Sequence, residues 1–324
     1  MNPLYENIGK ELNLGTLVSV ELIQSLWSGY GELVRLHFSK QSIIVKHVQL
    51  PKTSEHPRGW NTNFSHQRKL HSYQVEVNWY ENFSQSISER CRMPQGLKCF
   101  QRENEWLIVM EDLATSGFPS VVEKADKKHL KAVLHWLANF HAQHMGKRSE
   151  LIWEHGTYWH ISTRPDELEA LEDKELKKYA KEIDNVLEQN KYQTIVHGDA
   201  KLANFCFNAE GTHCAGLDFQ YVGHGCGMKD VALFMSSSVD PKDCEQMEVW
   251  VLDTYFLALD EALKHYQPEL DSADVEKAWR PMFAVAWADF QRFIKGWSPN
   301  HWKVNGYSEG VREGVLNDIK HFKY

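Results

Sequence analysis

The spacing of apolar residues changes part-way along this chain of 324 residues, and this change constrains the fold more than any other feature. Between residues 18 and 50, short apolar stretches such as Ile43–Val48 alternate with polar turn formers, a pattern typical of strands joined by tight turns. Beyond residue 113, apolar residues recur at intervals of three and four, as in amphipathic helices. The sequence therefore predicts an α+β architecture with a β-rich N-terminal lobe and a mainly helical C-terminal lobe.

We expect a small lobe at residues 1–113 and a larger lobe at residues 114–324, and a length of this size suits two lobes. The predicted elements of the small lobe are strands at 33–36, 43–48, 97–100 and 106–110, polar turns at 51–63 and 102–104, and a helix at 65–83. Those of the large lobe are helices at 132–141, 168–187, 247–263 and 275–297, with a strand-rich island at 194–221.

Composition excludes several classes of protein. Acidic residues outnumber basic ones by 44 to 36, and this balance argues against a nucleic-acid partner, which calls for a concentrated basic face. No apolar run approaches the ~18 residues that cross a bilayer, and no signal-like stretch follows Met1, so we expect no membrane partner and a cytoplasmic location. The six cysteines form no Cys-x-x-Cys pair, which fits reduced thiols.

The strand-rich island carries the strongest chemical signal. A predicted strand ends at His197-Gly198-Asp199, Asn204 follows five residues after Asp199, and Asp218 ends a further strand. A hairpin with its turn at 208–211 would bring Asp199, Asn204 and Asp218 together. For the His-Gly-Asp triplet alone, a plain turn is an equally good interpretation. The added Asn204 and Asp218 favour a catalytic one.

Two carboxylates and an amide that lie close together are stabilised by a bound cation or a reacting hydroxyl, because like charges at close range destabilise each other. Mg²⁺ prefers oxygen ligands and is usually held by one or two protein groups together with substrate phosphates. Asn204 and Asp218 are therefore predicted as the metal ligands. Asp199 remains as the group that accepts a proton.

These residues resemble the catalytic loop and the metal-binding Asp of kinase-like phosphotransferases. The form His197-Gly198-Asp199 is similar to the branch that contains aminoglycoside phosphotransferases, choline kinases and ecdysteroid-kinase-like proteins. The resemblance implies a two-lobed protein-kinase-like fold, ATP and Mg²⁺ as cofactors bound between the lobes, and a small-molecule alcohol as phosphate acceptor. It also implies that Lys201 balances the charge of the transferred phosphate.

A kinase needs a lysine for the nucleotide phosphates, and Lys46 is the candidate. It shares a strand face with Ile44 and Val48, while Glu76 lies within an aromatic stripe of the predicted helix. Each charged group alone is as well explained by a side chain that reaches water. Together with the downstream loop, they are predicted to form an ion pair in which Lys46 contacts the α- and β-phosphates.

Two further segments of the small lobe complete the predicted nucleotide site. Gly29 and Gly31 lie in a turn, Ser28–Glu32, whose backbone amides are expected to approach phosphate, although many plain hairpin turns have this composition. By resemblance, backbone groups at Glu111 and Leu113 in the connector between the lobes would bind the adenine base.

Alternatives from other classes remain open at this stage. A serine/threonine protein kinase is suggested by Lys201, but Gln220 follows Phe219 where glycine is expected, and little chain separates Asp218 from Asp230, which we expect to cap a helix. A non-catalytic ATP-binding scaffold is the third possibility. The acceptor, an amino-alcohol, aminoglycoside, sugar or sterol-like alcohol, and the oligomeric state are not predicted.

Two conspicuous residue groups are assigned to structure. Seventeen histidines suggest a metal site, above all beside Cys206 and Cys214, but their spacing matches no structural zinc pattern. An apolar stripe from Trp279 to Trp297 is predicted to be one buried helix face, with an aromatic substrate cage as the alternative.

Overall fold

The computed structural model describes residues 2–26, 29–49, 63–85, 88–102, 105–321 and 323. Residues 51–62 and 103–104 of the predicted polar turns, and Ser28 of the first glycine turn, lie outside the described residues. The chain forms two compact units, which we call the sheet unit (residues 1–88 and 93–120) and the helical unit (residues 89–92 and 121–324). No helix of the described residues is long and apolar enough to cross a membrane.

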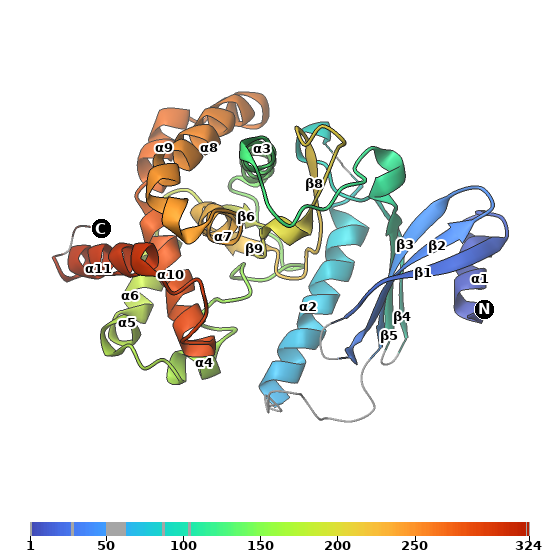
Figure 1. Ribbon diagram of the computed structural model, residues 1–324, viewed down its shortest axis with the longest axis horizontal. Coiled ribbons are helices and arrows are strands. Elements are labelled where there is room, and N and C mark those ends of the chain that lie inside the picture. The colour runs from blue at the N-terminus through green and yellow to red at the C-terminus, as the bar shows by residue number, and fades with distance from the viewer. Residues whose placement is uncertain are drawn as a thin grey trace. The chain divides into compact units, whose positions relative to one another are not determined.

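The sheet unit is built on five antiparallel strands in the order β1-β2-β3-β5-β4. Its elements are α1 (Pro3–Glu11), β1 (Leu17–Ser25), β2 (Gly31–Phe38), β3 (Ser42–Gln49), α2 (Asn63–Asn82), β4 (Gly96–Arg102), β5 (Glu105–Glu111) and a 3₁₀ turn at Leu113–Ser116. The predicted strands and the predicted helix of this region are thus confirmed, and β1 and α1 precede them (Figure 1).

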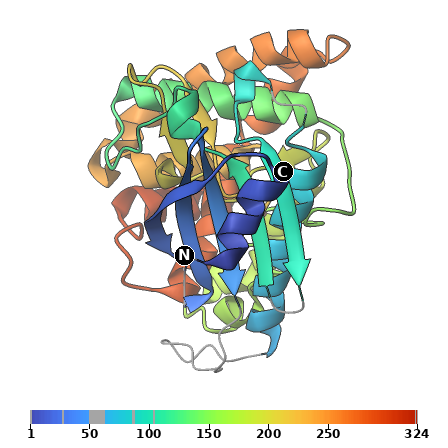
Figure 2. The ribbon, with the colours of Figure 1, turned by 90° about the vertical axis from the view of Figure 1, so that its right-hand side faces the viewer.

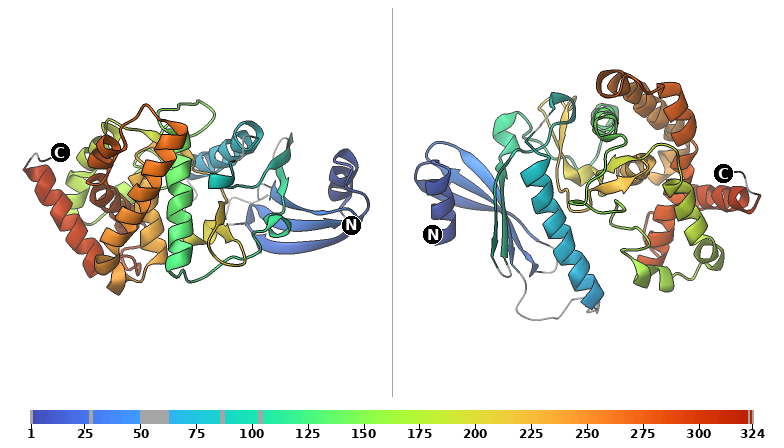
Figure 3. Two further views of the ribbon diagram at one scale, coloured as in Figure 1. Left: turned by 90° about the horizontal axis from the view of Figure 1, so that it is seen from above. Right: turned by 180° about the vertical axis from the view of Figure 1, so that it is seen from behind.

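The two faces of this sheet are covered by different helices. One face packs against α1, where Tyr5 and Ile8 join Val34, Val45 and Val109 in a buried cluster (Figure 2). Because side chains alternate along a strand, the other face presents Lys46, Trp106 and Ile108, and it packs against α2 (Figure 3). Lys46 lies opposite Ile108 in the β3–β5 register, so its ammonium group faces α2.

The helical unit surrounds short strands with helices. The helices are α3 (Lys127–His144), α4 (Pro165–Glu169), α5 (Lys174–Lys178), α6 (Ala180–Glu188), α7 (Met228–Ser238), α8 (Cys244–Tyr266), α9 (Ser272–Trp279), α10 (Met282–Trp297) and α11 (Gly306–Lys320). The strands are β6 (Thr194–Val196), β7 (Phe205–Phe207), β8 (Cys214–Gly216) and β9 (Gly223–Gly225), with 3₁₀ turns at Glu89–Cys91, Leu202–Asn204 and Pro241–Asp243. β6 pairs with β9, and β7 pairs with β8.

Two predicted long helices are interrupted, which corrects the sequence analysis. The stripe at 168–187 is divided among α4, α5 and α6, because Asp173 accepts a hydrogen bond from the N–H of Leu176 and starts a new helix at Lys174. The stripe at 275–297 is divided at Pro281, which cannot donate the backbone hydrogen bond that a continuous helix requires. Trp279 therefore ends α9 and does not share a helix with the aromatic residues of α10.

Aromatic packing forms the centre of the helical unit. Trp136 of α3 lies within 6.4 Å, between ring centres, of Phe140, Phe205 and Phe219. The aromatic stripe of α10 is buried as predicted, with Phe283 and Phe290 at most 1% exposed. α3 runs beside α8, and α10 packs against α7 (Figure 3). This packing holds the loops after β6 and β8 in position.

Candidate active site

The loop after β6 has a backbone geometry that only glycine accommodates at its second position. Gly198 has φ +79°, and a Cβ atom there would lie 2.0 Å from the carbonyl oxygen of Tyr221. The N–H of Tyr158 also donates to the carbonyl of Gly198 (3.2 Å). The Gly of the His-Gly-Asp triplet is therefore explained by close backbone approach.

The carboxylate of Asp230 holds this loop through hydrogen bonds to its backbone. Its carboxylate accepts hydrogen bonds from the backbone N–H groups of His197 (2.6 Å) and Gly198 (2.9 Å), and it lies 3.0 Å from Nε2 of His141. The other nitrogen of His141 lies 2.8 Å from the hydroxyl of Tyr255. Our expectation that Asp230 caps a helix was wrong, because α7 begins at Met228 and Asp230 lies within its first turn, with its carboxylate turned to the loop.

His197 ties the loop after β6 to the strand that leads to Asp218. Its Nδ1 accepts the N–H of Asp199 (3.2 Å), so Nε2 carries the proton and donates to the carbonyl of Leu217 (2.8 Å). The predicted hairpin is confirmed, since β7 and β8 pair and the N–H of Gly211 donates to the carbonyl of Asn208. Asp199 and Asp218 thus lie at the ends of segments that one imidazole holds together.

The two oxygens of Asp199 have different surroundings. Oδ2 accepts hydrogen bonds from Nζ of Lys201 (2.8 Å) and from Nδ2 of Asn204 (3.0 Å). Oδ1 is buried and has no hydrogen-bond partner among the described residues. Because a buried carboxylate oxygen without a donor is costly, this oxygen can accept a hydrogen bond from a further molecule.

Asn204 and Asp218 present oxygens of the kind that Mg²⁺ prefers. Nδ2 of Asn204 donates to both the carbonyl (2.8 Å) and the carboxylate of Asp199, and this fixes the amide with Oδ1 on its other side. Asp218 adopts a left-handed backbone, φ +64°, and its Oδ1 accepts from Nε2 of Gln220 (2.6 Å). Such strain in a non-glycine residue is concentrated at functional sites. The donor set fits a hard divalent cation.

Lys303 and Tyr158 lie near Asp199 and were missed in the sequence. Burial lowers the pKa of Lys303 to about 8, while the charge of Asp199 acts in the opposite direction. Burial, followed by the negative charge of Asp199, raises the pKa of Tyr158 far above its ordinary value. Both residues come from loops without regular spacing to the His-Gly-Asp triplet, so no sequence pattern could have identified them.

In the sheet unit, the predicted ion pair between Lys46 and Glu76 is present. Nζ of Lys46 lies 2.9 and 2.7 Å from the two carboxylate oxygens of Glu76, and the side chains are 7% and 1% exposed. Ser72, Tyr73 and Tyr80 of α2 are buried around it. The pair positions an ammonium group on the face of the sheet that packs against α2. Its contact with phosphate remains a prediction.

The other predicted residues of the sheet unit, Gly29, Gly31, Glu111 and Leu113, differ in their surroundings. Gly31, at φ +121°, leaves no room for a Cβ atom beside the carbonyl of His47, whereas Gly29, at φ +73°, has open space around it. The N–H of Glu111 donates to the carbonyl of Gln95 (3.0 Å), and Leu113 is buried at the start of a 3₁₀ turn. The contact of backbone groups at Glu111 and Leu113 with adenine remains a prediction.

The fold and the two sets of polar residues define a class of protein, the kinase-like phosphotransferases with a β-sheet N-terminal part and a helical C-terminal part. Models of the ecdysteroid kinase-like family match residues 39–151 and 145–268. The chain therefore belongs to the ecdysteroid kinase-like family.

Solved structures support the same fold. The microcompartment-associated aminopropanol kinase is 10% identical, with a TM-score of 0.53 and coverage of 98% of this chain and 96% of that chain. The ethanolamine kinase of Plasmodium vivax is 13% identical, with a TM-score of 0.51 and coverage of 96% and 87%. Among curated proteins, none matches the sequence significantly. The likeness at these identities concerns the fold.

Proposed function

We propose that this protein is an ATP-dependent kinase that transfers the γ-phosphate to a hydroxyl of a small molecule, with Asp199 as the catalytic base. The observation that carries the proposal is the asymmetry of the Asp199 carboxylate, whose Oδ2 is held by Lys201 and Asn204 while Oδ1 has no partner among the described residues. A carboxylate fixed in this way is oriented for proton transfer without reorganisation.

The other predicted residues take complementary roles. Asn204 and Asp218 would hold Mg²⁺, which when bound neutralises charge on the nucleotide phosphates. Lys46, oriented by Glu76, would contact the α- and β-phosphates, with Gly29 and Gly31 beside the phosphates and Glu111 to Leu113 beside the base. These assignments rest on the resemblance and on the contacts within each unit.

The transfer step follows from this arrangement. The acceptor oxygen forms a bond to the γ-phosphorus as the bond between that phosphorus and the bridging oxygen of ADP breaks. The hydroxyl proton passes to Oδ1 of Asp199. Lys201, 2.8 Å from Oδ2, lies where its ammonium group can balance charge on the transferred group.

A small molecule is the favoured acceptor because the chain between Asp218 and Asp230 is fully used. Residues 223–225 form β9, paired with β6, and α7 begins at Met228. No segment remains there to bind a peptide, which disfavours the protein-kinase alternative. Two of the similar structures are those of an aminopropanol kinase and an ethanolamine kinase, which agrees with an alcohol acceptor.

The test is a screen for ADP formation and phosphorylated product over amino-alcohols, aminoglycosides, sugars and sterols. We expect Asp199→Asn to lower kcat on the order of 10²- to 10⁴-fold and to leave the Kd for Mg·ATP nearly unchanged. Asp218→Ala should weaken Mg-dependent nucleotide binding as well. Asp274→Asn removes an exposed carboxylate of the same unit and serves as the matched control.

Two results would contradict the proposal. Full turnover by Asp199→Asn would exclude this residue as the base. Mg·ATP binding by the unaltered protein, without product from any acceptor in the panel, would favour the non-catalytic scaffold.

A further inference from the structure

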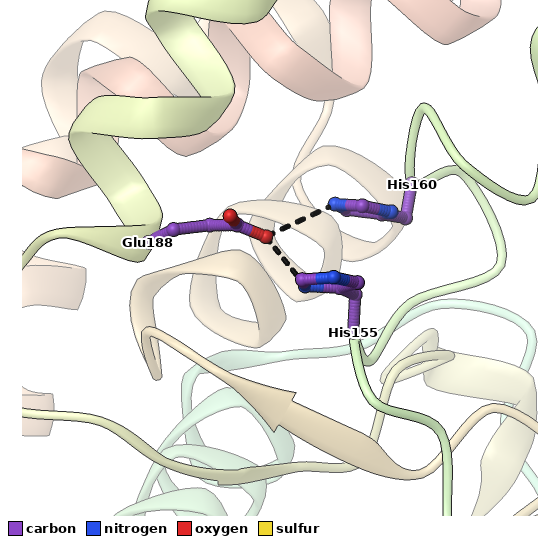
Figure 4. A group of neighbouring side chains, drawn as sticks. All are labelled: His155, His160 and Glu188. Atoms are coloured by element: carbon purple, nitrogen blue, oxygen red, sulfur yellow. Dashed lines mark ion pairs between the residues drawn. The ribbon is translucent and has the colours of Figure 1, made fainter.

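A second cluster of polar side chains lies in the helical unit, apart from the residues assigned above to phosphate transfer. His155 and His160 come from the loop between α3 and α4, and Glu188 ends α6. Oε1 of Glu188 lies 2.5 Å from Nδ1 of His155 and 3.4 Å from Nε2 of His160 (Figure 4). The two imidazole rings are stacked, with 4.4 Å between their centres.

A fourth polar side chain, that of Asp184, belongs to this cluster. Asp184 lies one helical turn before Glu188 on α6, so both carboxylates project from one face of the helix. Oδ1 of Asp184 lies 3.0 Å from Nε2 of His160. His160 and Asp184 are only 2% and 5% exposed, so the cluster has an interior side closed to water.

The contacts of Nε2 of His160 with Asp184 and Glu188 are close but are not aligned as hydrogen bonds. Nε2 of His160 and Oδ1 of Asp184 are both buried, and neither has a correctly aligned hydrogen-bond partner among the described residues. Nδ1 of His160 accepts the N–H of Ser162 (3.2 Å) and lies 2.7 Å from Oγ of the same residue. These contacts direct Nε2 at the carboxylates of Asp184 and Glu188, and a metal ion bound there would take the place of the Nε2 proton.

We propose that His155, His160, Asp184 and Glu188 bind a divalent transition-metal ion of the Zn²⁺ type. Two imidazole nitrogens with carboxylate oxygens are the donor set that such ions take, with bonds of about 2.0–2.2 Å. The facing nitrogen and oxygen atoms of His155, His160 and Glu188 lie within 4.8 Å of one another, so small side-chain rotations bring them around one ion.

The loop that carries both histidines is held in place by its backbone. The N–H of Gly156 donates to the carbonyl of His224 (2.8 Å), and that of Thr157 donates to the carbonyl of Tyr221 (3.1 Å). The ligands are therefore positioned before an ion binds. A metal ion would join this loop to α6. Because the N–H of Tyr158 in the same loop donates to the carbonyl of Gly198, the ion would also restrict the backbone beside Gly198.

A cavity beside the cluster offers an entry path. His155 and Glu188 line it together with Arg148, Glu154, His224 and Lys229. The ammonium group of Lys229 opposes cation binding, but Asp184 and Glu188 supply two negative charges against it. The competing explanation is that the four groups merely share protons in a buried ion-pair network, and metal binding separates the two explanations.

The experiment measures binding of Zn²⁺ and Co²⁺ to the full chain in the absence of nucleotide and Mg²⁺, so that its outcome does not depend on the proposed kinase activity. We expect one Zn²⁺ per chain by equilibrium dialysis and elemental analysis, and a rise in Tm. Co²⁺ should give visible absorption bands of nitrogen and oxygen ligation. His155→Ala and Glu188→Gln should weaken binding on the order of 10- to 100-fold.

His265→Ala removes an exposed histidine of the same unit and should leave the affinity unchanged. His155 is about one-third exposed, so its replacement tests the site with little risk to folding, and circular dichroism verifies the fold. The proposal is overturned if the unaltered chain binds no Zn²⁺. It is equally overturned if His155→Ala binds as tightly as the unaltered chain, or if Co²⁺ shows the charge-transfer bands of thiolate ligands.

Discussion

Lys303 has an unusual environment for a lysine of the helical unit. Its ammonium group donates to Oγ of Ser236 (3.2 Å), lies over the ring of Phe290, and is half-buried. Burial lowers the pKa of Lys303 from 10.5 to about 8, despite the attraction of Asp199. The folded chain therefore releases this proton more readily than the unfolded chain does.

This difference gives stability a defined pH dependence. Between pH 8 and 10.5 the unfolded state holds a proton on Lys303 that the folded state has lost, so the free energy of unfolding gains a contribution as pH rises through this window. Below pH 8 both states are protonated, and the burial cost is fully present. We expect Lys303→Met to gain stability relative to the unaltered protein at pH 7 and to lose that advantage by pH 10.

Urea unfolding of both proteins at several pH values measures the effect. The quantity of interest is the difference between the two free energies of unfolding, in which groups common to both proteins cancel. A difference that is constant between pH 7 and pH 10 would show that Lys303 titrates normally in the folded state.

At the scale of elements, the turn after β6 depends on the absence of a side chain at Gly198. A methyl group there meets the carbonyl oxygen of Tyr221 at 2.0 Å in addition to the cost of φ +79°. Gly146, in the same unit, has φ +73° but no atom within 4 Å of the added Cβ. Alanine substitutions at the two glycines therefore distinguish the cost of steric overlap from the cost of backbone strain.

We expect Gly146→Ala to lower the free energy of unfolding by about 1–2 kcal/mol, the cost of a left-handed alanine. Gly198→Ala should lower it by clearly more and should also displace Asp199, so that kcat falls. Thermal or urea unfolding with an activity assay measures both. Equal losses of stability in the two variants would mean that the loop shifts to accept the methyl group.

The ion pair between β3 and α2 is the second feature at this scale. Lys46→Met leaves the carboxylate of Glu76, 1% exposed, without its lysine, and such a change typically costs about 3–5 kcal/mol. The double variant Lys46→Met/Glu76→Leu should recover much of this loss, because no unpaired charge then remains buried. A double-mutant cycle by urea unfolding measures the coupling.

Lys98→Met is the matched control within the sheet unit, because Lys98 pairs with Glu11 and both side chains are more than 40% exposed. We expect a change of at most about 1 kcal/mol there. If the double variant at Lys46 and Glu76 were as unstable as the single variant, packing rather than charge would account for the effect.

At the scale of the whole molecule, each unit has its own core and its own polar set. The sheet unit buries an apolar cluster between α1 and the sheet and places Lys46 on the opposite face. The helical unit buries Trp136 and the stripe of α10 and places Asp199, Asn204 and Asp218 on loops at short strands. Each polar set therefore adjoins the apolar core of its own unit.

Much of this organisation was predictable from local pattern. Alternation over Ile43–Val48 predicted both the strand and the inward direction of Lys46, and helical spacing placed Glu76 among aromatic residues. The turn formers at 208–211 predicted the hairpin between Asn204 and Asp218. These predictions succeeded because strand alternation, helical periodicity and turn chemistry act over a few neighbouring residues.

Other features depend on contacts between distant residues. The short helices α4, α5 and α6 follow from Asp173, which caps α5 and pairs with Lys295 and Arg312, more than a hundred residues later. β9 forms because glycine-rich residues 223–225 lie against β6. No local pattern encodes such partners, and α1 and α11 were likewise not predicted.

The sequence by itself determined the order of the lobes, the hairpin between Asn204 and Asp218 and the ion pair of the sheet unit, because strand alternation, helical spacing and turn formers act over a few neighbouring residues. Only the tertiary structure decided that Asp230 holds the loop, that Lys303 and Tyr158 lie near Asp199, and that two histidines meet the end of α6. The physical reason is that the environment of a polar group is set by whichever segments pack around it, and that packing is a property of the folded chain.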